Sequence, residues 1–78
     1  MKIELVRKAT PGSYNLYTVT NHAGTIIGLL EKYPDTKTEK HPWKAFSGHG
    51  TNVKFLRSYY PDEGGKKAAL AAVVTAAG

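Results

Sequence analysis

Only the last part of this 78-residue chain has the composition of a helix, and that limits the folds open to it. Residues 63–78 read EGGKKAALAAVVTAAG, and alanine is the best helix former of all residue types. We expect a helix over about residues 64–77, with Asp62 or Gly64 as its N-cap. Four residues spaced i, i+3, i+4 and i+7 predict one apolar stripe on it. They are Leu70, Val73, Val74 and Ala77.

Five segments before this helix have the composition or the alternation of β-strands, and turn residues separate them. The third segment is apolar on both faces, so we expect it at the centre of a sheet. Gly28 inside it indicates a bulge or a close backbone contact. The five segments are residues 2–8, 14–20, 25–33, 43–46 and 53–60.

The order of these segments predicts an α+β fold in one domain, residues 1–78. Short consecutive turns favour an antiparallel β-meander of four to five strands, spanning about residues 2–60. A twisted antiparallel sheet needs one face covered, and the C-terminal helix can cover it. The other face then stays open, so we look for function there.

The composition of the chain indicates the cellular compartment in which we expect the protein. The chain has no cysteine, which excludes disulfides and cysteine-ligated zinc or iron–sulfur sites. Its first ten residues are too charged for a signal peptide, and no apolar run approaches the roughly 20 residues that span a bilayer. We therefore expect a soluble, cytoplasmic protein with no membrane partner.

Catalytic patterns are weak. Three histidines lie in three separate loops without metal-ligand spacing, the serines lack a nucleophile motif, and the six acidic residues are scattered. The glycine-rich residues 47–52 lack the phosphate-loop pattern and precede a strand, so we expect a hairpin turn there. We expect no catalytic residue, no metal and no cofactor, and hence a protein that is not an enzyme.

The positive net charge indicates a binding function instead. The formal net charge is +5, which favours nucleic acid or an acidic protein surface as the partner. Residues 34–42 form a long polar loop, and basic and aromatic residues interleave after it. Lys44, Lys54 and Arg57 are expected to approach one another near the open face or edge of the sheet. The predicted binding residues are Lys40, Trp43, Lys44, Lys54, Arg57, Lys66 and Lys67.

Other interpretations stay open at this stage. The aromatic residues can belong to the core, with the lysines protecting an edge strand against aggregation. The positive charge can also serve solubility alone. A second functional class is a protein-interaction module, which docks on an acidic host protein through exposed aromatics or adds a strand at an open edge. The same edge can make a homodimer.

Two stretches of the sequence resemble segments of known proteins. FLRSYYPDEGGKKAALAAVV resembles the closing unit of small orphan accessory proteins of actinobacterial bacteriophages, and GTIIGLLEKY with PWKAF resembles their preceding hairpin. The resemblance covers about residues 14–77, although Gly64 and Gly65 stand where those proteins carry charged helix formers. At fold level the chain is similar to the arm-type DNA-binding domains of phage integrases. These likenesses imply a phage-encoded binding module in the host cytoplasm, with Lys44, Lys54 and Arg57 as candidate DNA contacts.

Overall fold

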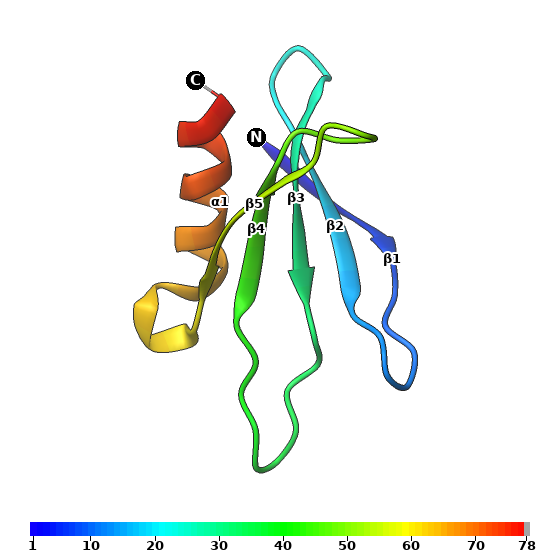
Figure 1. The fold of residues 1–78 in the computed structure, drawn as a ribbon, viewed down its shortest axis with the longest axis vertical. Coiled ribbons are helices and arrows are strands. Elements are labelled where there is room, and N and C mark those ends of the chain that lie inside the picture. The colour runs from blue at the N-terminus through cyan, green and yellow to red at the C-terminus, as the bar shows by residue number, and fades with distance from the viewer. Residues whose placement is uncertain (78) are drawn as a thin grey trace.

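The computed structural model describes residues 1–77 and has five strands followed by one helix (Figure 1). Each strand pairs antiparallel with the next in the chain, so the sheet order is β1-β2-β3-β4-β5. This confirms the predicted α+β meander and fixes the strand number at five. The elements are β1 (Lys2–Arg7), β2 (Asn15–Thr20), β3 (Ile26–Lys32), β4 (Trp43–Ser47), β5 (Lys54–Tyr59), the 3-10 turn η1 (Pro61–Glu63) and α1 (Gly65–Ala77).

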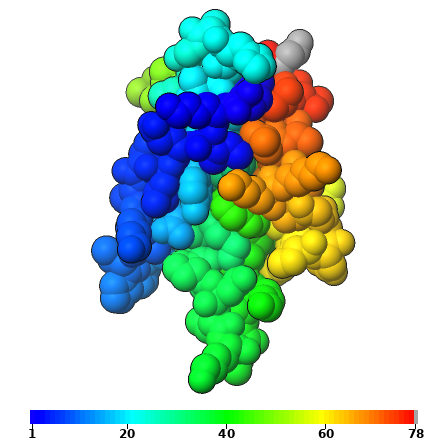
Figure 2. All heavy atoms as spheres, turned by 180° about the vertical axis from the view of Figure 1, so that it is seen from behind, coloured from blue at the N-terminus to red at the C-terminus, as the bar shows by residue number. Residues whose placement is uncertain are grey.

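The core lies between α1 and one face of the sheet. Its fully buried sheet residues are Val19, Leu30 and Ala45, one each from β2, β3 and β4. The register brings them together, because Leu30 of the central strand pairs with Ala45 and Val19 pairs with Gly28. Figure 2 looks onto this face, with α1 in orange and red on one side and β1 in dark blue on the other.

The helix approaches the sheet closely at Gly28. A Cβ atom built on this glycine would collide with Cγ1 of Val73 in α1 and with the carbonyl oxygen of Phe46 in β4. Gly28 is therefore the close backbone contact that the sequence indicated. The helix packs on β3, β4 and β5 in this way and leaves the opposite face of the sheet uncovered.

The buried stripe of the helix differs from the prediction. It runs through Gly65, Ala69 and Val73 at intervals of four residues. Val73 was predicted correctly, and the predicted Leu70 packs against the core while partly buried, but Val74 is 37% exposed and Ala77 is also exposed. The smallest side chains face the sheet because the backbones approach most closely there, so residue size and not apolarity alone selects the buried side.

The start of the helix settles the choice of N-cap. The carbonyl of Gly64 accepts a hydrogen bond from the N–H of Ala68 at 3.2 Å, so Gly64 occupies the capping position and Asp62 lies in η1. Gly64 has φ of +103°, a conformation that favours glycine. One oxygen of the Glu63 carboxylate accepts the N–H of Tyr60 at 3.0 Å, which fixes the turn between β5 and α1.

Candidate functional site on the open sheet face

The uncovered face carries side chains in cross-strand rows, because alternate residues of every strand point away from α1. One row begins at Arg7 in β1 and passes through Leu16, Glu31 and Lys44. It ends at Ser58, which pairs with Lys44. A second row contains Leu29 of β3 and, beside it, Phe46 and Phe55, whose rings contact each other at a tilt of 58° with 5.4 Å between their centroids.

At and just beyond the strand ends, aromatic rings and cations form a connected line. The guanidinium carbon of Arg7 lies 4.6 Å from the centroid of the Tyr14 ring. Tyr14 meets Tyr33 edge to face at 5.5 Å, and the Tyr33 ring lies 5.8 Å from that of His41. The Nζ atom of Lys44 lies 5.7 Å from the Tyr33 centroid. We call these five residues the aromatic–cation line; its distances are those of genuine ring–ring and cation–π contacts.

A pocket of about 440 Å³ opens at one end of this line. Tyr33 and His41 line it from the β3–β4 side, and Ser58 and Tyr60 from the end of β5. Tyr60 is 46% exposed, so its ring is free to meet a ligand. Pro42 and Lys44 complete the lining.

The β3–β4 loop is held in place by one carboxylate. Oδ1 of Asp35 accepts a hydrogen bond from the Nζ of Lys32 at 2.6 Å and another from the backbone N–H of His41 at 2.8 Å. The bond from Lys32, and after it the bond from His41, lowers the pKa of Asp35 below its ordinary value. Lys32 also donates to the carbonyl of Tyr33 at 2.8 Å. Asp35 thus fixes His41 relative to Tyr33 at the pocket wall.

Two cations of this face, Arg7 and Lys44, have no acidic partner within ion-pair distance in the described part of the chain. Among residues 1–77, neither Arg7 nor Lys44 has a carboxylate oxygen within 4.0 Å. Glu31 lies opposite Lys44 in the register, outside ion-pair distance. Most other carboxylates are paired elsewhere: Glu4 with Lys2, Asp35 with Lys32, Glu39 with His41, and Glu63 with Arg57. The charges of Arg7 and Lys44 are therefore available to an anionic ligand.

The structure separates the three cations that were expected to meet. Lys44 lies on the open face, whereas Arg57 pairs with the buried Ala45 and lies on the helix side. A bulge in β5 at Leu56 turns both Leu56 and Arg57 towards the helix. Lys54 lies opposite Ser47 at the far end of β5. The predicted cluster of Lys44, Lys54 and Arg57 is therefore not formed.

The remaining predicted residues divide between the helix face and the surface. Trp43 packs at the rim of the core, 5.2 Å from the Tyr17 ring, and the Nζ of Lys66 lies 5.7 Å from Trp43. Lys40 is exposed in the β3–β4 loop and Lys67 is exposed on the helix. Only Lys44 of the predicted set joins the aromatic–cation line, and Lys40 lies in the loop that carries His41.

Several residues of this site were missing from the sequence prediction. Arg7, Tyr14, Tyr33 and Tyr60 lie at or just beyond the observed strand ends, although the predicted segments 2–8, 14–20, 25–33 and 53–60 contain them. Alternation within those segments already placed each tyrosine on one face of its strand, but the prediction did not follow that face from one strand to the next. His41 carried no such signal, because its position depends on the fold of the loop.

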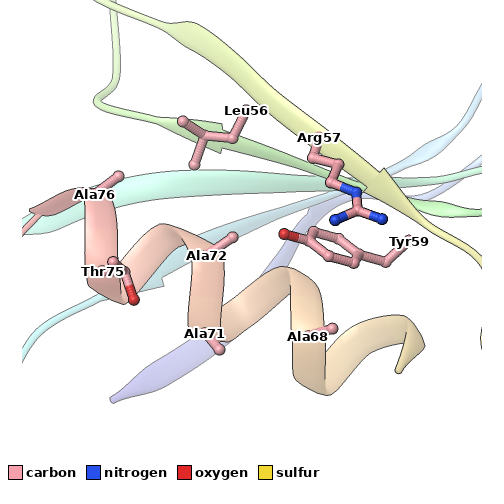
Figure 3. A pocket seen from close by; sticks show the side chains of 8 residues that line it. All are labelled: Leu56, Arg57, Tyr59, Ala68, Ala71, Ala72, Thr75 and Ala76. Atoms are coloured by element: carbon pink, nitrogen blue, oxygen red, sulfur yellow. The ribbon is translucent and has the colours of Figure 1, made fainter. Parts of the chain in front are cut away.

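A second hollow lies on the opposite side of the molecule, between β5 and α1 (Figure 3). It measures about 610 Å³ and is walled mainly by alanines of the helix, with Leu56 and Tyr59 on the strand. The guanidinium of Arg57 lies 5.0 Å from the Tyr59 centroid and pairs with Glu63 at 3.5 Å. Because its cation is already paired, this groove is a weaker candidate for an anionic ligand.

Comparisons with family models, curated proteins and solved structures find no match to this chain. Within residues 1–77, no helix has both the length and the apolarity needed to cross a membrane. The same residues contain no group of three or more His, Asp or Glu side chains placed to hold a metal ion.

Proposed function

We propose that the protein is a binding module that holds nucleic acid on the open face of its sheet. One observation carries the proposal: Arg7 and Lys44 lie over tyrosine rings on this face, with no carboxylate oxygen of residues 1–77 within 4.0 Å of either cation. A polyanion with planar bases satisfies both kinds of group at once. The net charge of +5 adds long-range attraction to such a ligand.

The chemistry of each contact is simple. Cationic side chains that neutralise phosphates release condensed counterions, which makes binding favourable and salt dependent. Exposed aromatic rings stack on bases without regard to sequence, and this adds about 1–3 kcal/mol per base. Following the resemblance to bacteriophage accessory proteins, we place this binding in the cytoplasm of a bacterial host.

Fluorescence anisotropy tests the proposal. Labelled single strands and duplexes are titrated with the protein at about 50 and 200 mM salt, and two phosphate contacts predict about a sevenfold loss of single-strand affinity between them. Lys44→Glu should weaken binding and flatten the salt dependence. Arg57→Glu makes the same charge change on the helix side and is the matched control. Absence of binding at low salt, or equal loss in both variants, would contradict the proposal.

A second candidate function is favoured by the β1 edge of the sheet. Leu5 and Val6 are 47% and 51% exposed on this outer strand, an unusual exposure for apolar residues at an edge. Such a strand can pair with a strand of a protein partner or of a second copy. The bulge between Leu5 and Arg7 limits this pairing to the first part of β1.

Light scattering at about 200 mM salt separates this candidate from the first. A dimer that Leu5→Lys converts to a monomer would support edge pairing. A monomer at every concentration would remove the second-copy form of it. Binding of nucleic acid that survives Leu5→Lys would show that the edge is not the nucleic-acid site.

A further inference from the structure

We infer that the bound nucleic acid is single-stranded and that one of its bases inserts between Tyr33 and Tyr60. This rests on the proposed function and specifies the form of the ligand. The pocket at this end of the aromatic–cation line has a ring on each side, a proline between them and a lysine at its wall. A flat nucleotide base fits between the two rings, and its anionic phosphate link fits the lysine.

The register sets the width of the gap. Lys32 pairs with Trp43, and Trp43 pairs with Tyr59. One residue further on, Tyr33 and Tyr60 stand two strand intervals apart, which is roughly 10 Å. Pro42 lies between them in the same pocket and has no long side chain to fill the space. A base about 3.4 Å thick therefore has room above the proline, with a tyrosine on either side.

The Tyr33 ring and the Tyr60 backbone are positioned before any ligand arrives. The Tyr33 ring contacts the rings of Tyr14 and His41, at centroid distances of 5.5 and 5.8 Å. The backbone of Tyr60 is held by the Glu63 carboxylate through its N–H at 3.0 Å. Its carbonyl accepts the N–H groups of Glu63 at 2.8 Å and of Gly65 at 3.1 Å. A site that is already ordered loses less entropy when a ligand binds.

The polar groups of the pocket suit a nucleotide. Lys44 offers a cation for the phosphate next to the inserted base. His41 and Ser58 offer hydrogen-bonding groups to the base edge. The other end of the aromatic–cation line carries Arg7 over Tyr14, which offers a second phosphate contact and another ring.

This arrangement disfavours a duplex. In a double helix each base is stacked above and below, so its face cannot meet a tyrosine unless the base leaves the stack, which costs a few kcal/mol. A single strand presents its bases at little cost, and aromatic platforms on sheets are a general solution for such ligands. The pocket therefore favours single strands, whereas the cations alone would bind both forms.

Substitutions at Tyr60 test the inference. Tyr60→Leu keeps an apolar side chain but removes the ring, and we expect about a tenfold loss of affinity for a single strand of about 12 nucleotides. Tyr60→Phe should bind like the parent chain. Phe55→Leu is the matched control, because Phe55 is 51% exposed on the same face but outside the pocket. The fluorescence of Trp43, the single tryptophan, reports on the helix side whether each variant is folded.

The outcomes separate the two proposals. Tight binding of single strands, weak binding of duplexes and loss in Tyr60→Leu alone would support the inference. Equal binding of both forms, or equal loss in Phe55→Leu, would overturn it and leave the proposed function standing, provided that Lys44→Glu still weakens binding. Absence of salt-dependent binding to either form would overturn both. Parallel titrations with thymidine and uridine strands distinguish DNA from RNA as the source of the base.

Discussion

The two faces of the sheet differ in what lies at their centre. On the face under α1, Gly28 and Ala45 meet Ala69 of the helix where the two layers are closest, and the larger side chains of this face pack around them. The open face has the Tyr14–Tyr33 pair and the Phe46–Phe55 pair, with cations beside the tyrosines. In this small domain the tight core needs few large residues, and most of the large aromatics are left for a surface that nothing covers.

A cation over an aromatic pair occurs on both faces, and the setting distinguishes them. On the helix side, Lys66 lies 6.0 Å from the Tyr17 ring and 5.7 Å from Trp43, and its backbone belongs to the first turn of α1. There the contact ties the helix to the sheet. On the open face, Lys44 contacts Tyr33 with no second layer above it. We therefore expect changes on one face to alter stability and changes on the other to alter binding.

The largest expected effect is a side chain at Gly28. Gly28→Val would force atoms into Val73 and into the Phe46 carbonyl, so we expect a loss of about 3 kcal/mol in the free energy of unfolding. Urea denaturation followed by tryptophan fluorescence measures it. Gly50→Ala is the control: no atom lies within 4 Å of the added Cβ, and its φ of +63° alone should cost about 1 kcal/mol. Equal losses would show that the helix does not pack closely on β3.

The next effect distinguishes two adjacent residues of the helix. Val73 is fully buried, whereas Val74 is 37% exposed. Val73→Ala should lower the free energy of unfolding by about 2 kcal/mol, and Val74→Ala by less than about 1 kcal/mol. Thermal or urea unfolding of the two variants measures the difference. Similar losses would favour the stripe predicted from the sequence over the observed one.

A change on the open face should show the reverse pattern. Tyr33→Ser removes the ring that contacts Tyr14, His41 and Lys44. We expect single-strand affinity to fall at least tenfold, while the free energy of unfolding falls by only about 1 kcal/mol. Anisotropy and urea denaturation of the same variant provide the two values. Global unfolding of this variant would instead assign Tyr33 to the core.

The smallest effect concerns the pH dependence of the β3–β4 loop. Hydrogen bonds from Lys32 and from the backbone of His41 lower the pKa of Asp35 below its ordinary value of 3.8. The stabilisation is therefore complete above about pH 4 and is lost as the pH falls through the lowered pKa. The amide shift of His41 should show an acid transition below about pH 4, where the Asp35 carboxylate that accepts its N–H becomes protonated. In Asp35→Asn this acid transition should disappear; if it persists, another group controls the loop.

Local patterns were enough to predict the fold. Alternation and turn residues located all five strands, and alanine content located the helix, because each signal is a property of a short segment. The faces were harder to assign. The bulge at Leu56 moves Arg57 to the helix side, and no residue pattern in 53–60 indicates this bulge. The hydrogen bonds that Asp35 accepts from Lys32 and His41 in the loop likewise depend on contacts that alternation does not encode.

An NMR titration tests the central claim most directly, namely that the uncovered face binds a single strand. Amide shifts of the labelled protein are followed as a strand of about 12 nucleotides is added at low salt. We predict changes centred on Tyr33, His41, Lys44 and Tyr60, with little change at Ala69. Changes centred on α1 and the groove beside Leu56, or none at saturating strand, would contradict the account.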